Sequence, residues 1–187
     1  MVTGAPDVVF MDRDGVLNED RPDHVKTPDE LVMIDGAAEA VSRLVASGRL
    51  VVVITNQSAV GRGLMDEVTL ARVHDKLDHA VTGAGGRIDR IICCPDPPWA
   101  ATERRKPAPG MLVEALEAYG CRAEDAPFIG DSLRDLEAAA AVGCPRILVR
   151  TGKGEATLAA GLPPRLQPVS VRLDLADAAD ALLKASP

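Results

Sequence analysis

The sequence predicts an α/β domain in which helices cover both faces of a parallel sheet. Short apolar runs alternate with amphipathic segments along the chain, and several of the runs stop at Gly, Asp or Thr. Such runs are typical of buried parallel strands, and the segments between them suit crossover helices. The 187 residues, 47% of them hydrophobic, are expected to form one domain, 1–187, with a well-buried core.

Strands and helices are expected in regular order. Strands are predicted at 8–11, 50–54, 88–94, 126–129 and 146–149, with a short sixth strand near 169–173. Apolar residues recur at helical spacing between the strands, and several of these segments end at a glycine. Helices are therefore predicted at 36–48, 66–83, 109–119, 134–142 and 174–184.

Two segments interrupt this alternation. Residues 18–34 are polar and contain Pro22 and Pro28, which favours a projecting hairpin or flap beside the first strand. Residues 95–107 contain four prolines, which predicts a stiff loop on the side where the strands end. Neither segment is large enough for a separate cap domain.

The composition argues against several classes of function. A net charge of −7 and 2% aromatic residues offer neither a broad basic face nor a stacking surface, so no nucleic-acid partner is expected. No run of about 18 apolar residues and no secretory signal is found, so no membrane partner is expected either. Four cysteines without paired spacing indicate a cytoplasmic protein. A small phosphorylated partner is compatible with this composition.

Two aspartates follow the first predicted strand. Asp12 is the candidate nucleophile, because a carboxylate can divide phosphate-ester hydrolysis into two steps through an aspartyl-phosphate. Asp14, two residues on, points the same way in an extended chain and can serve as general acid and then as base. Crowded carboxylates are expected to raise at least one pKa. The alternative is an ordinary polar turn at Asp14-Gly15.

Mg²⁺ is the cofactor that this set of carboxylates predicts, because it prefers oxygen ligands. The expected ligands are Asp12, the main-chain carbonyl of Asp14, and Asp131. Gly130 is expected to let the chain turn sharply before Asp131. Asp135, one helical turn further on, is expected to orient a metal-bound water.

Three further residues are suited to binding anions. The Thr55 hydroxyl and the amides that follow it can bind phosphoryl oxygens, and Lys106 can act on the same oxygens as a point cation. The planar guanidinium of Arg105 suits a second anionic group. The alternative for Thr55 is an ordinary turn, and the alternative for Lys106 is a solvated loop lysine.

Together these segments resemble the haloacid dehalogenase superfamily of phosphatases. The four matching motifs are Asp12-Arg13-Asp14-Gly15, Thr55-Asn56-Gln57-Ser58, Arg105-Lys106-Pro107, and Gly130-Asp131 with Asp135. The match runs from about Val8 to Gly152 and is similar to the small, capless branch. It implies a Rossmann-like, haloacid dehalogenase-like parallel sheet sandwiched by helices, capless with a short flap.

The resemblance also implies a role for each matching residue. Asp12 is the nucleophile and Asp14 the acid/base, while Thr55 and Lys106 stabilise the phosphoryl group. Mg²⁺ is held by Asp12, Asp14 and Asp131. The remaining substrate contacts are Asn56, Gln57, Ser58 and Arg105, together with Asp20 and His24 in the flap.

The branch implies that the substrate, and the only expected partner, is a small phosphorylated sugar. The protein itself is expected to be a monomer. The leading expectation is hydrolysis of D-glycero-D-manno-heptose 1,7-bisphosphate at position 7. Histidinol phosphate, an intermediate of histidine biosynthesis, is the second candidate. A phosphate-binding or scaffolding domain without catalysis is the third.

One departure from the branch concerns zinc. Many members carry a Cys-x-His pair and a Cys-x-Cys pair before the Arg-Lys-Pro segment, whereas Cys94-Pro95-Asp96 keeps only the first cysteine. Zinc is therefore not expected here, and Cys93 and Cys94 are interpreted as apolar residues at a strand end. Because the loop borders the expected crevice, its change bears on which substrate is accepted. His74 and His79 are expected to have packing or surface roles.

Overall fold

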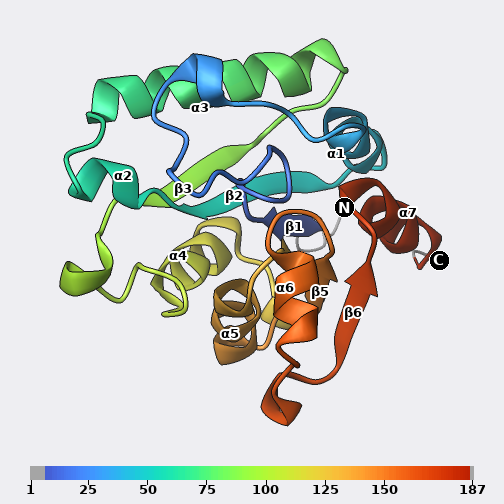
Figure 1. The fold of residues 1–187 in the computed structure, drawn as a ribbon. Coiled ribbons are helices and arrows are strands. Elements are labelled where there is room, and N and C mark those ends of the chain that lie inside the picture. The colour runs from blue at the N-terminus through green and yellow to red at the C-terminus, as the bar shows by residue number, and fades with distance from the viewer. Residues whose placement is uncertain (1–6, 186–187) are drawn as a thin grey trace.

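Six parallel strands form one sheet in the computed structural model, which describes residues 7–185 (Figure 1). The sheet order is β3-β2-β1-β4-β5-β6. From β1 the chain adds β2 and β3 on one side of the sheet and then β4, β5 and β6 on the other, so the strand order switches between β1 and β4. Ligands bind at such a switch point in open parallel sheets. The strands are β1 Val8–Met11, β2 Leu50–Asn56, β3 Arg90–Cys94, β4 Phe128–Gly130, β5 Arg146–Val149 and β6 Val169–Arg172.

Helices cover both faces of the sheet, as predicted. Val9 and Met11 of β1 pack in the core shared with α1, α3 and α7, whereas Val8 and Phe10 pack in the core shared with α4 and α5. Figure 1 shows α3 on one side of the sheet and α4 and α5 on the other. The helices are α1 Ala37–Ala46, α2 Ser58–Gly61, α3 Glu67–Gly83, α4 Gly110–Tyr119, α5 Leu133–Val142, α6 Gly154–Ala159 and α7 Leu175–Lys184. Among the described residues, none of these helices combines the length and the apolar character that a membrane span needs.

The element boundaries differ from the sequence predictions mainly at the ends of strands. The strands at 8–11 and 146–149 are confirmed, but β2 continues through Thr55 and Asn56, which pair with β3. The helices α2 and α6 were not predicted, because four and six residues are too few to show a helical period. Residues 1–6 and 186–187 of the predicted domain lie outside the described part of the chain.

Residues 18–34 form an irregular segment that packs on the core. A single antiparallel bridge joins Asn18 to Met33, and a short 3₁₀ helix spans Pro28–Glu30. Val25 and Leu31 are buried in the same core as α1. The segment is therefore a flap with apolar anchors, and not the projecting hairpin that its polar sequence also allowed.

The cysteines beside the proline-rich loop are packing residues. Cys94 ends β3 in the core under α4, and Cys93 packs partly buried against a cluster around Ala59 and Met65. All four cysteines of the chain are free thiols. These positions agree with the interpretation of Cys93 and Cys94 as apolar strand-end residues.

The two histidines on α3 have different surroundings. His79 is exposed, and its Nδ1 lies 2.6 Å from the Asp75 carbonyl oxygen. His74 Nε2 is buried and has no hydrogen-bond partner among the described residues. Burial lowers the pKa of His74 to about 4, and the nearby positive charge of Arg13 adds to the effect.

This burial predicts a pH-dependent contribution of His74 to stability. The unfolded chain binds a proton at His74 near pH 6.5 and the folded chain only near pH 4, so protonation favours unfolding as the pH falls between these values. His74→Leu should remove the contribution, and the wild type should lose stability relative to this variant across the interval. Urea unfolding followed by circular dichroism measures the difference. His79→Gln is the matched control, and a stability difference for His74→Leu that stays constant with pH would contradict the prediction.

Candidate active site

A crevice of about 240 Å³ lies at the carboxyl end of the sheet, beside the switch point. Ten of the residues singled out from the sequence line it, namely Asp12, Asp14, Asp20, His24, Asn56, Ser58, Arg105, Lys106, Asp131 and Asp135. A larger hollow of about 460 Å³ lies at the other end of the strands, around Pro145 and Pro168, and none of the predicted site residues lines it. The smaller crevice is therefore the candidate active site.

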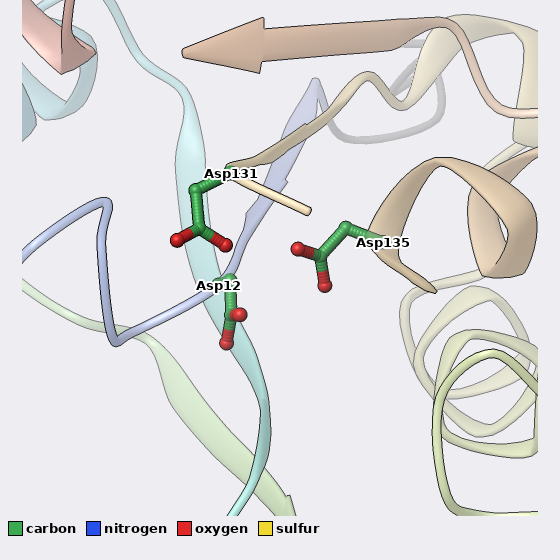
Figure 2. A group of neighbouring side chains, drawn as sticks. All are labelled: Asp12, Asp131 and Asp135. Carbon is green, nitrogen blue, oxygen red and sulfur yellow. The ribbon is translucent and has the colours of Figure 1, made fainter. Parts of the chain in front are cut away.

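Three carboxylates converge at the base of this crevice. Asp12 follows β1, Asp131 follows β4, and Asp135 lies in the first turn of α5. Figure 2 shows the three side chains grouped together, with the carboxylates of Asp131 and Asp135 on either side of a common space. One oxygen from each lies within 4.8 Å of the others. Asp131 and Asp135 are buried. The donor set fits a hard divalent cation such as Mg²⁺, which takes carboxylate oxygens.

Burial and mutual repulsion raise the pKa of two of the three carboxylates. Burial raises the pKa of Asp12 to about 6, with Asp135 and Asp14 adding to the rise and Lys106 opposing it. Burial, together with the charges of Asp135 and Asp12, raises the pKa of Asp131 to about 8. The expected rise in pKa therefore falls on Asp12 and Asp131. A bound cation would offset the repulsion between the carboxylates that adds to this rise.

Lys106 is the cation that the chain itself supplies. Its Nζ lies 2.6 Å from Asp135 Oδ1 and 3.0 Å from Asp12 Oδ1, and it donates to the Ile54 carbonyl at 2.8 Å. These three contacts use all three ammonium donors. Burial alone would lower the pKa of Lys106, but the two carboxylates outweigh it and raise that pKa. With 2% of its surface exposed, Lys106 is not the solvated loop lysine that was the alternative.

Side chains of the second motif hold other site residues in place. Asn56 Nδ2 donates to the Lys106 carbonyl at 3.0 Å, and its Oδ1 accepts from the Lys106 amide at 3.1 Å. Gln57 Nε2 donates to Asp14 Oδ2 at 2.8 Å and to Thr55 Oγ1 at 2.9 Å. Thr55 is fully buried and does not line the crevice. Direct substrate contacts by these three side chains stay a prediction.

Asp14 is held apart from the three converging carboxylates. Arg13, itself fully buried, forms an ion pair with Asp14 Oδ1 at 2.9 Å, and Asn18 Nδ2 donates to the same oxygen at 2.9 Å. Burial would raise the pKa of Asp14, but Arg13 and the hydrogen bonds from Asn18 and Gln57 lower it. Asp14 is therefore held as a carboxylate.

Two glycines make room for the Asp131 carboxylate. A Cβ on Gly15 would lie 2.0 Å from Asp131 Oδ2, and one on Gly152 would lie 2.3 Å from the same atom. The Gly152 loop also brings the Lys153 amide within 2.8 Å of Asp131 Oδ2. Because glycine has no Cβ, the main chain at both positions can approach the Asp131 carboxylate closely, and any other residue there would clash with it.

Gly130 has a different role from the one expected. It ends β4, and a Cβ there would lie 2.3 Å from the Asp135 Cβ, so close approach and not a sharp turn requires glycine. Asp135 Oδ2 accepts from the Ser132 amide at 3.1 Å and from the Ser132 hydroxyl at 2.6 Å. Asp135 thus joins the start of α5 to Lys106.

The walls of the crevice are cationic. Four basic residues that the sequence interpretation did not assign to the site also line it: Arg21, Arg62, Arg134 and Lys153. Arg62 and Lys153 each stand between two glycines, a pattern that indicates an exposed turn. No comparable pattern surrounds Arg134 on α5. Among the flap residues, Asp20 pairs with Lys153 Nζ at 2.7 Å. Burial and the charge of Arg62 lower the pKa of His24, which has a positive φ of 67°.

Comparison with known proteins places the chain in a family. The model of HAD-hydrolase-like proteins matches residues 103–178, and relatives 43% identical to the chain align with 95% of it. The chain belongs to the haloacid dehalogenase superfamily of phosphatases. The two relatives are the D-glycero-β-D-manno-heptose-1,7-bisphosphate 7-phosphatases of Bordetella bronchiseptica and Pseudomonas aeruginosa, and the match covers 98% of each.

Two solved structures share the fold over nearly the whole chain. The D,D-heptose 1,7-bisphosphate phosphatase from B. bronchiseptica, complexed with magnesium and phosphate, is 42% identical with a TM-score of 0.93, covering 96% of this chain and 99% of that one. The D,D-heptose 1,7-bisphosphate phosphatase from Burkholderia thailandensis is 40% identical with a TM-score of 0.75, covering 95% and 98%. The predicted fold class is confirmed.

The contacts of Lys106 predict that its charge supports both folding and activity. Lys106→Met leaves Asp135 buried without its cation, and breaking a buried ion pair in this way costs about 3 to 5 kcal/mol. The free energy of unfolding in urea should fall by about this amount, and phosphatase activity should be lost. Lys184→Met, on an exposed position of α7, is the control. A variant as stable as the wild type would show that Asp135 does not need this partner.

Proposed function

We propose that the chain is a Mg²⁺-dependent phosphatase that removes the 7-phosphate from D-glycero-β-D-manno-heptose 1,7-bisphosphate through an aspartyl-phosphate on Asp12. The observation that carries the proposal is the cluster of carboxylates of Asp12, Asp131 and Asp135, two of which contact Lys106, in a chain 43% identical to phosphatases named for this substrate. The magnesium and phosphate in the structure of the B. bronchiseptica relative support the choice of cofactor and reaction.

In this proposal Asp12 attacks the phosphorus atom. Its Oδ1 accepts from the Arg13 amide at 2.7 Å and lies 3.0 Å from Lys106 Nζ. Oδ2 has no protein donor among the described residues, so we assign the attack to that oxygen. Two donors on Oδ1 fix the carboxylate and favour its charged form, which is the nucleophilic one.

Asp14 moves the proton in both steps. Arg13 and Asn18 hold it as a carboxylate, so it is prepared to accept a proton from the water that hydrolyses the aspartyl-phosphate. In the first step the nearby negative charge of the bound phosphate raises the pKa of Asp14, so that it takes up one proton from solvent and gives that proton to the leaving oxygen. Asp14 is then a carboxylate again and accepts the proton of the attacking water in the second step. Gln57 keeps Asp14 in position through Oδ2.

Mg²⁺, held by Asp12, the main-chain carbonyl of Asp14, and Asp131, would supply positive charge for the phosphoryl oxygens. Lys106 adds the positive charge of its ammonium group, and the main-chain amides after Thr55 donate hydrogen bonds to the phosphoryl oxygens. Zinc is not part of the proposal.

The cationic wall favours a bisphosphate over the second candidate substrate. Arg62, Arg105 and Arg134 line the crevice, and no described carboxylate forms an ion pair with them. Guanidinium groups suit a second phosphate, whereas they repel the ammonium group of histidinol phosphate. Substrate contacts from Asp20, His24 and Ser58 complete the proposed binding site.

We also propose that residues 1–187 act as one phosphatase domain, a cytoplasmic monomer whose partner is a small phosphorylated sugar. The flap at 18–34 and the loop at 95–107, without zinc ligands, would border its substrate. The net charge of −7 and the few aromatic residues support the absence of a nucleic-acid partner. The expectation of no membrane partner rests on the lack of a run of about 18 apolar residues.

Replacing the nucleophile should abolish turnover without unfolding the chain. Asp12→Asn keeps the size of the side chain but removes the attacking carboxylate, so phosphate release should fall at least about a thousandfold. Phosphate release from the bisphosphate with Mg²⁺ measures this. Asp78→Asn, on an exposed face of α3, is the matched control. Activity that survives in Asp12→Asn would exclude Asp12 as nucleophile.

A substrate panel separates the two phosphatase candidates and the non-catalytic one. The heptose 1,7-bisphosphate should have a kcat/KM at least about tenfold above that of histidinol phosphate, because only the bisphosphate offers a second anion to the arginines. Each substrate is assayed with Mg²⁺ and again with a chelator, which should stop turnover. A preference for histidinol phosphate would overturn the substrate assignment, and absence of turnover on every substrate would favour a binding domain.

A further inference from the structure

The loop that precedes Lys106 is closed by a carboxylate. Asp96 Oδ2 accepts from the Thr102 hydroxyl at 2.6 Å and from the Thr102 amide at 2.9 Å. These two bonds join residues six positions apart and enclose the short 3₁₀ helix Pro98–Ala100. The Thr102 hydrogen bonds lower the pKa of Asp96, so the side chain stays charged and the bonds are charge-assisted.

The closed turn determines where Arg105 lies. Arg105 Nη1 donates to the Asp96 carbonyl at 2.7 Å, and the Arg105 amide donates to the Thr102 carbonyl at 3.1 Å. Both the guanidinium and the main chain of Arg105 therefore depend on the two residues that close the loop. Arg105 is only 8% exposed, and it lines the crevice.

The other side of the loop is attached to α2. The Gly61 amide donates to the Pro95 carbonyl at 3.1 Å, and a Cβ on Gly61 would lie 2.4 Å from that oxygen. The guanidinium of Arg62 stacks on the Trp99 ring, 4.9 Å from its centre. Fixed at both sides, the loop presents Arg105 to the crevice from a rigid support.

We propose that Asp96 is a positioning residue, whose carboxylate closes the 95–107 loop on Thr102 and thereby holds the Arg105 guanidinium for the non-reacting phosphate of a bisphosphate substrate. The proposal rests on the bisphosphatase function proposed above. Asp96 acts through Arg105 and takes no part in the reaction at Asp12. Its loss should therefore change the binding of a bisphosphate more than the chemical step.

The test compares two substrates that differ in the second anion. On the heptose 1,7-bisphosphate, Asp96→Ala should raise KM about tenfold and leave kcat within about twofold of the wild type. On p-nitrophenyl phosphate, which has only the reacting phosphate, both constants should stay within about twofold. Asp96→Asn keeps an acceptor oxygen for Thr102 and should restore most of the affinity. Glu117→Gln, exposed on α4, is the control.

A double-mutant cycle with Arg105 tests whether Asp96 acts through it. In the Arg105→Ala background, Asp96→Ala should raise KM for the bisphosphate by less than about twofold, because the group that it positions is already gone. If Asp96→Ala fails to fold, Thr102→Val is used in its place in every measurement. It removes the hydroxyl that donates to Asp96 and keeps a side chain of similar volume.

Three results would overturn the positioning role: equal losses on both substrates, no loss on either, or additive effects with Arg105→Ala. A wild-type chain that turns over p-nitrophenyl phosphate but not the bisphosphate would instead refute the proposed function, and this proposal with it.

Discussion

The ammonium group of Lys106 is the interaction on which the site depends. It lies between the carboxylates of Asp12 and Asp135 and touches the carbonyl of Ile54, so it joins the ends of β1 and β2 to the start of α5. Without it, the buried carboxylate of Asp135 would face the partly buried carboxylate of Asp12 across the switch point, at a cost of several kcal/mol. Because Asn56 holds the main chain of Lys106 from both sides, the position of this cation is set by β2.

Close main-chain approach is the second constraint, and it explains the glycines around the site. Gly15, Gly130 and Gly152 come from three separate segments, and a Cβ at any of them would lie 2.3 Å or less from the side chain of Asp131 or Asp135. The carboxylates are thereby packed against backbone, which excludes water and raises the pKa of Asp131. The same tight packing holds the carboxylate oxygens in an arrangement that suits a small, hard cation.

The sequence predicted the fold and the polar centre of the site because both follow from simple rules. Apolar runs predict buried strands, and groups after parallel strands meet at one edge, which brought Asp12, Asp131 and Lys106 together. Chain pattern could not show that Asn56 and Gln57 bind other site residues, since hydrogen-bond partners depend on tertiary geometry. Arg134 escaped notice for the same reason, because an arginine in the first turn of a helix is ordinary until the crevice is seen.

Arg105 and Lys106 are consecutive in the chain and line the same crevice, although Lys106 contacts the carboxylates of Asp12 and Asp135 whereas Arg105 contacts the loop that starts at Pro95. This junction therefore tolerates little change in length, because an insertion next to Arg105 would displace the ammonium group that lies between Asp12 and Asp135. The span between Asp96 and Thr102 is different, since its ends are already tied together and its middle, with Trp99, is exposed. The length and composition of that span can therefore change while the contacts that hold Lys106 between Asp12 and Asp135 stay in place.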